Sequence, residues 1–139
     1  MRGEGPRCVV FYASRDEANI QCFQNHLQKV YPTIKVIAVS DGTDAVKYFS
    51  TGEDQHEVPC LIIMDVVMPS KTGIEALEEI RRHPIHCYTP AVLISKAPFH
   101  YEHVVEEKLK AKLVIRPNCD QKKKELIKDV FTSFCPGIC

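Results

Sequence analysis

Residues 61–73 read Leu61-Ile62-Ile63-Met64-Asp65-Val66-Val67-Met68-Pro69-Ser70-Lys71-Thr72-Gly73, and this stretch decides the fold. An apolar run leads into one carboxylate, Asp65, and Pro69 and Gly73 then interrupt the chain before a helical pattern begins. Because the run is short and bounded by breakers, it predicts a buried central strand rather than a helix. Asp65 would end that strand at the edge of a parallel sheet where ligands bind. Burying a carboxylate at this place costs free energy, which favours a role for Asp65 in ligand binding or chemistry.

Strand and helix patterns alternate on both sides of this stretch. The predicted strands are residues 8–13, 35–40, 61–64, 91–95 and 113–115. The predicted helices are residues 17–30, a short helix through Val46 and Phe49, and residues 74–81, 101–110 and 121–134. This alternation predicts an α/β fold with a parallel sheet covered on both faces. We expect the flavodoxin-like (βα)5 three-layer sandwich, with strand order 2-1-3-4-5.

The size and charge of the chain exclude several classes of protein. We interpret the 139 residues as one domain, with a core from about 7 to 134, a short tail at 135–139 and no room for an output domain. Eighteen basic and eighteen acidic side chains cancel, so no overall field draws nucleic acid or an anionic membrane. The first residues lack the apolar core of a signal peptide, and no apolar run reaches membrane-spanning length. We expect a cytoplasmic protein.

Cysteine and histidine residues offer weaker patterns. Seven cysteines without a Cys-x-x-Cys pair predict small, reduced core residues. The spacing of His83, His86 and Cys87, and of His100 and His103, is typical of metal ligands. Their positions in loops and at a helix start favour exposed histidines over a zinc site.

Asp65, Met68, Pro69 and Gly73 fall in an order and spacing that closely resembles the phosphoacceptor region of response-regulator receiver domains. The resemblance, to single-domain CheY-like regulators, covers about residues 7–134. It implies that Asp65 accepts a phosphoryl group from a histidine kinase or a histidine phosphotransfer protein. It also implies a switch in protein–protein contacts through the fourth helix, fifth strand and fifth helix, with no enzyme activity beyond self-catalysed phosphotransfer and dephosphorylation.

The same resemblance implies the residues around Asp65. Ser95, at the end of the fourth predicted strand, matches the hydroxyl that binds a phosphoryl oxygen. Arg116 stands where the family has a lysine before proline. Arginine keeps the positive charge, but its guanidinium is planar, whereas the lysine ammonium is a flexible point charge. Lys96 adds a second candidate phosphate-binding cation, although its position slightly favours a solvated loop lysine. Leu113 stands where the family has a switching aromatic residue, so that switch is absent.

Mg²⁺ is the cofactor that the resemblance implies, with Asp65, the backbone carbonyl of Val67 and, more weakly, Asp16 as ligands. The family holds this ion with two adjacent acidic residues after the first strand. Here Ser14 and Arg15, or Ala13 and Ser14, stand in their place. We therefore expect weak or lost Mg²⁺ binding.

Two further expectations concern this segment. Ser14-x-x-Glu17 has the pattern of a capping box that opens the first helix, with Asp16 as a metal ligand the alternative. Arg15 or Arg116 is expected to pair with Asp65 and to fill the place of the cation.

The degraded acidic pair leaves a second function open, that of a pseudo-receiver. Such a module would keep the fold and Asp65 but would bind partners independently of phosphorylation. The sequence leaves the kinase, the target and the oligomeric state open, a homodimer included.

Overall fold

The computed structural model of the chain describes residues 9–30, 34–50, 59–84, 86–95 and 104–115. Five strands run through it: β1 (Val9–Ala13), β2 (Lys35–Val39), β3 (Leu61–Asp65), β4 (Ala91–Ser95) and β5 (Ala111–Ile115). Between them lie α1 (Glu17–Val30), α2 (Gly42–Ser50), α3 (Gly73–Arg81) and a short π-helix, η1 (Val104–Lys108). The predicted fifth helix lies outside the described residues.

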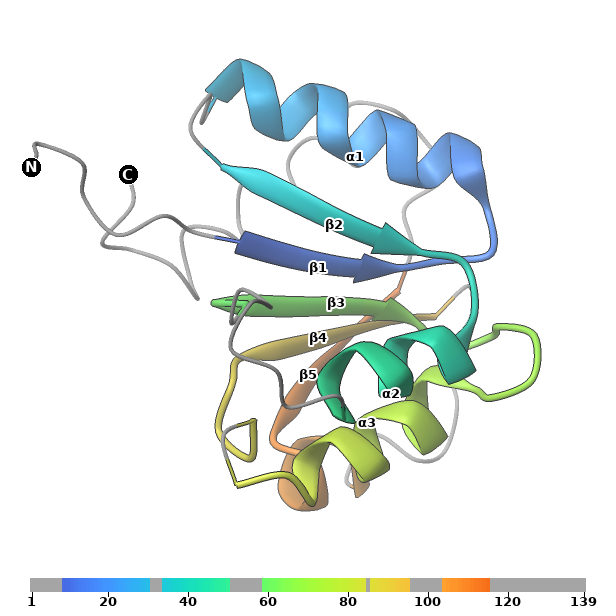
Figure 1. Cartoon of the computed structure of the whole chain (residues 1–139), viewed down its shortest axis with the longest axis vertical. Coiled ribbons are helices and arrows are strands. Elements are labelled where there is room, and N and C mark those ends of the chain that lie inside the picture. Colours follow the sequence, from blue (N-terminus) through green and yellow to red (C-terminus); the bar gives the residue numbers. More distant parts are fainter. Residues whose placement is uncertain (1–8, 31–33, 51–58, 85, 96–103, 116–139) are drawn as a thin grey trace, which may run out of the picture.

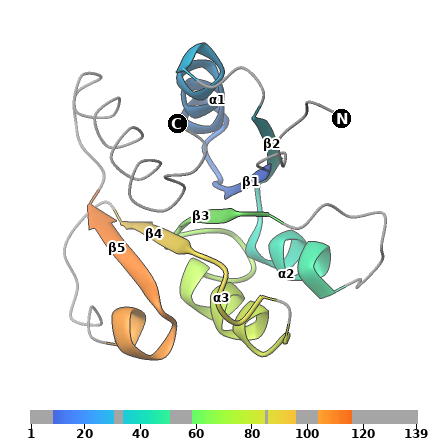
Figure 2. The same ribbon diagram turned by 90° about the vertical axis from the view of Figure 1, so that its left-hand side faces the viewer.

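All five strands form one parallel sheet in the order β2-β1-β3-β4-β5. Helix α1 covers one face of the sheet, and α2 and α3 cover the other (Figures 1 and 2). The predicted flavodoxin-like three-layer fold and its strand order are confirmed. The carboxyl ends of β1 and β3, which are neighbours, therefore meet at one edge.

Two hydrophobic cores fill the spaces between the layers. On the α1 side, Val10, Tyr12, Leu61 and Ile63 pack with helix residues that include Leu27. The opposite side holds a larger core, whose members from β1, β3, α2 and α3 include Phe11, Ala13, Ile62, Met64, Phe49 and Leu77. Successive residues of β1 and β3 thus alternate between the two cores, and both strands are buried throughout.

Helix ends follow local capping chemistry. Thr72 caps α3 in a capping box, in which its hydroxyl accepts the N–H of Glu75 and the Glu75 carboxylate accepts the N–H of Thr72. These hydrogen bonds lower the pKa of Glu75. The Asp41 carboxylate accepts the N–H of Thr43 at 2.8 Å and so begins α2.

Several expectations differ from the structure. β5 starts at Ala111, two residues before the predicted strand, and the described part of the predicted fourth helix is a π-helix rather than an α-helix. Cys60 is disulfide-bonded, so the expectation of reduced cysteines is wrong for this residue, whereas Cys22 and Cys87 are free. His86 is only 7% exposed, so the prediction of an exposed loop histidine is wrong there.

Among the described residues, no helix is both long enough and apolar enough to cross a membrane.

Candidate functional site

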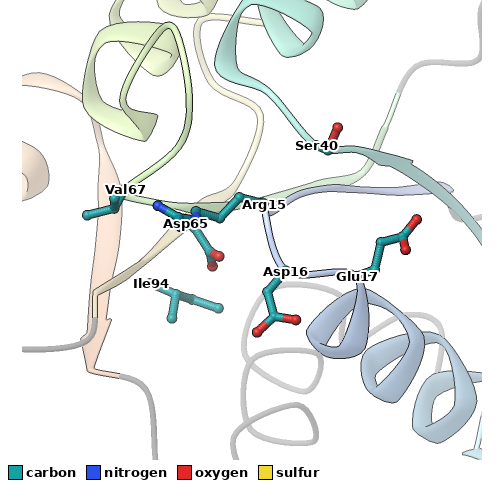
Figure 3. Close-up of a pocket in the computed structure, with 7 residues that line it drawn as sticks. All are labelled: Arg15, Asp16, Glu17, Ser40, Asp65, Val67 and Ile94. Carbon is teal, nitrogen blue, oxygen red and sulfur yellow. The ribbon is translucent and has the colours of Figure 1, made fainter.

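A cavity of about 650 Å³ lies at the carboxyl ends of β1, β2 and β3. Its described lining residues are Arg15, Asp16, Glu17, Ser40, Asp65, Val67 and Ile94 (Figure 3). Asp65 ends β3, is 5% exposed and contributes its carboxylate to the cavity. The predicted placement of Asp65, at the end of a buried central strand, is confirmed.

Ser14 is a direct partner of Asp65. It follows β1, is fully buried, and its hydroxyl donates to Asp65 Oδ2 at 2.5 Å. The same Ser14 oxygen accepts the backbone N–H of Asp16 at 3.1 Å, so its proton is free to point at the carboxylate. A hydrogen bond from a hydroxyl to an ionised carboxylate in this distance range is a strong one.

The register of the sheet explains this contact. Ala13 of β1 pairs with Met64 of β3, so the next residues, Ser14 and Asp65, lie side by side where the strands end. Ala13 and Met64 both face the core under α2 and α3, and the following two side chains therefore face the opposite way. Ser14 therefore occupies one of the positions where the family has an acidic residue, and it is the residue of this segment that contacts Asp65.

The predicted capping box between Ser14 and Glu17 is wrong. Helix α1 is capped by Asp16, whose Oδ1 accepts the N–H of Ala18 at 2.9 Å and whose carbonyl accepts the N–H groups of Asn19 and Ile20. A tertiary partner 51 residues away takes the Ser14 hydroxyl instead. Asp16 still lines the cavity, so its predicted role toward a metal stays a prediction.

Arg15 lies at the mouth of the cavity and is exposed. Figure 3 shows its side chain extending toward Val67. Within the described part of the chain, no ion pair joins Arg15 to Asp65, so the prediction of that pair is wrong for Arg15. The two other predicted cations, Lys96 and Arg116, lie outside the described residues.

Ser95 and Val67 lie at the same edge of the sheet. Ser95 ends β4 and is 9% exposed, but its neighbour Ile94 is the residue that lines the cavity. Val67 lines the cavity and is 57% exposed. The predicted phosphate contact of Ser95 and the predicted metal contact of the Val67 carbonyl stay predictions.

The loop that carries Val67 is held on both sides. Ser70, whose φ is 63°, donates its hydroxyl to Asp41 Oδ2 at 3.1 Å. At its far end the Gly73 N–H donates to the Val66 carbonyl at 2.8 Å, and a side chain at position 73 would collide with the Asp65 carbonyl oxygen. The glycine is therefore required for α3 to start against the end of β3.

The donor set of the cavity suits Mg²⁺ poorly. This ion prefers charged carboxylate oxygens in octahedral geometry. Ser14 supplies a neutral hydroxyl that donates to Asp65, and one oxygen of Asp16 already caps α1. The residues described here contain no group of three histidine, cysteine or acidic side chains arranged to hold a metal ion.

Comparison with known proteins identifies the family. The family model for the response regulator receiver domain matches residues 10–114, which is most of the chain. The protein therefore belongs to the response regulator receiver domain family, whose members act in two-component signalling.

One curated relative and two solved structures illustrate the similarity. The 3',5'-cyclic-nucleotide phosphodiesterase regA of Dictyostelium discoideum is 29% identical over 94 residues, which are 68% of this chain but only 11% of that protein. The phosphorylated cyanobacterial phytochrome response regulator RcpA superposes with a TM-score of 0.84 at 21% identity, covering 96% of this chain and 98% of the other. The Mn²⁺-bound response regulator Rcp1 gives a TM-score of 0.78 at 18% identity, covering 90% and 92%. At such identities the two structures show the shared fold.

Proposed function

We propose that this domain is a receiver whose Asp65 accepts a phosphoryl group from a phosphohistidine on a histidine kinase or phosphotransfer protein. In this step an Asp65 oxygen forms a bond to phosphorus while the bond from phosphorus to the imidazole nitrogen breaks, and the histidine leaves. The modified domain then changes its protein contacts. The domain carries out at most self-catalysed phosphotransfer and dephosphorylation at Asp65.

The observation that supports this proposal best is the setting of Asp65. The side chain is 5% exposed, yet it borders a cavity large enough to admit a phosphoryl group. It ends the central strand, at the edge where ligands bind in parallel sheets. Burying a carboxylate does not stabilise a core, so the position of Asp65 is best explained by a functional role at the cavity.

Mg²⁺ would neutralise phosphoryl oxygens at this site if it bound, as divalent ions do in phosphoryl transfer generally. Asp65, the Val67 carbonyl and Asp16 are the groups that the family resemblance assigns to it. We propose that they bind it weakly, because Ser14 brings no charge to the place of a carboxylate.

The pseudo-receiver is the second candidate function, and the residues after β1 favour it. Ala13, Ser14 and Arg15 follow one another there, so the positions where the family has its adjacent acidic pair supply no carboxylate. A domain of this kind would bind its partners without modification at Asp65.

The two candidates differ in one measurement. The protein is exposed to phosphoramidate with Mg²⁺, and its intact mass is compared with that of Asp65→Asn treated in parallel. Addition of one phosphate to the wild-type protein and none to Asp65→Asn supports the phosphoacceptor. An unmodified wild-type protein, with an ordinary receiver domain modified in the same experiment, supports the pseudo-receiver.

We further propose that the domain works in the cytoplasm with protein partners rather than nucleic acid or membranes. The balance of eighteen basic and eighteen acidic residues supports this, because it creates no overall field toward a polyanion.

A further inference from the structure

We propose that the Ser14 hydroxyl replaces a metal-binding carboxylate as a resting partner of Asp65, so that an internal hydrogen bond rather than a divalent cation holds the carboxylate. The inference concerns the pocket of the proposed function and rests on the role proposed there for Asp65. Its tests use binding and stability, so they can fail or succeed independently of phosphorylation.

The geometry assigns the direction of the hydrogen bond. Ser14 Oγ lies 2.5 Å from Asp65 Oδ2 and 3.1 Å from the backbone nitrogen of Asp16. The nitrogen donates, so the hydroxyl oxygen is its acceptor and the hydroxyl proton goes to the carboxylate. An ionised carboxylate can only accept, so each group in this chain of hydrogen bonds has its complement.

Burial makes the contact strong and fixes its position. Ser14 is 0% exposed and Asp65 is 5% exposed, so water competes little with the hydroxyl. The Ser14 backbone is held as well, since its N–H donates to the Val39 carbonyl of β2 at 3.0 Å. The backbone from which the hydroxyl reaches Asp65 is therefore fixed to the end of the neighbouring strand.

The same bond opposes a cation. A metal ion at Asp65 Oδ2 would compete with the hydroxyl proton for this oxygen, and Ser14 would offer it only a neutral oxygen. An aspartate at position 14 would bring an anionic oxygen to the same place, as Mg²⁺ requires. The guanidinium of Arg15 lines the same cavity and adds a positive charge near the entering ion.

The first test is a Mg²⁺ titration of the wild-type protein and of Ser14→Asp, followed by NMR of the backbone amides near Asp65. We expect Ser14→Asp to bind Mg²⁺ at least about tenfold more tightly than wild type, because even a partner outside the ligand shell changes metal affinity about 10–100-fold. Ser50→Asp is the matched control. Ser50 is exposed at the end of α2, outside the described lining of the cavity, and its hydroxyl donates to the Lys47 carbonyl at 3.2 Å, so this variant should titrate as wild type does.

The second test covers the case in which Ser14→Asp fails to fold. Ser14→Ala, Asp65→Ala and the double variant form a double-mutant cycle, measured by urea unfolding in buffer with a chelator. We expect a coupling of at least about tenfold in the folding equilibrium constant, as for a buried hydrogen bond to a charged group. Coupling below about twofold would overturn the inference. So would a folded Ser14→Asp that binds Mg²⁺ no more tightly than wild type.

Discussion

Replacing Arg81 should destabilise the domain far more than replacing the neighbouring Arg82. Arg81 ends α3, and its guanidinium donates to three backbone carbonyls, those of Leu109 at 2.7 Å, His86 at 2.8 Å and Lys110 at 3.2 Å. These carbonyls lie in the loop before β4 and in the connection between η1 and β5. One side chain therefore joins three segments of the chain, and burial lowers the pKa of Arg81.

The size of the effect follows from the contacts. A hydrogen bond to a charged group contributes about 1.5–3 kcal/mol when buried. Because Arg81 is only half-buried and its acceptors regain water in the variant, we expect Arg81→Ala to cost about 3 kcal/mol in total. Arg81→Lys should lose most of this as well, since an ammonium group cannot reproduce the planar fork.

Urea denaturation measures the difference. With a slope of about 2 kcal/mol per M, a loss of about 3 kcal/mol lowers the unfolding midpoint by roughly 1.5 M. Arg82→Ala is the matched control because Arg82 is exposed, and it should change stability by no more than about 0.5 kcal/mol. If Arg81→Ala and Arg82→Ala unfolded at the same urea concentration, the three hydrogen bonds of Arg81 would not stabilise the domain.

Three further predictions concern single residues. Burial, and then the nearby His83 and Arg81, lower the pKa of His86, so the unfolded chain binds the proton more readily. The contribution of neutral His86 to stability is then fully present above the ordinary histidine pKa of about 6.5 and is lost as the pH falls below it. Thermal unfolding of the wild-type protein between about pH 7.5 and 5 should show this decrease in stability. His86→Leu should make the decrease smaller. Gly73→Ala should cost about 1–3 kcal/mol in urea unfolding because its Cβ would collide with the Asp65 carbonyl, while Glu78→Ala on the exposed side of α3 should change little. Thr72→Ala removes the cap of α3 and should cost about 0.5–2 kcal/mol in the same assay; no loss would contradict the capping box.

Local pattern was enough to predict most of the fold. The bounds of α1 and β4 agree with the prediction, because apolar spacing and flanking breakers define them within the segment itself. The start of β5 was missed because Ala111 and Lys112 favour no strand on their own. Their pairing with Ala91 and Val92 of β4 makes them one.

The candidate site was less predictable than the fold. Asp65 could be found because its own strand ends at it. Ser14 was assigned to a local cap because its sequence neighbours offer one, whereas its hydroxyl bonds across the sheet to Asp65. The alternation of inward and outward residues in the first and third strands was the available indication, but it needs the register between them, which only the folded sheet supplies.

The most direct test of the central claim is to locate the phosphate. After exposure to phosphoramidate with Mg²⁺, the protein is treated with borohydride, which reduces an aspartyl phosphate to homoserine, and its peptides are sequenced by mass spectrometry. We expect homoserine at position 65 in wild type, a higher yield in Ser14→Asp, and none in Asp65→Asn. Phosphate that persists on Asp65→Asn, or homoserine at another position, would contradict it.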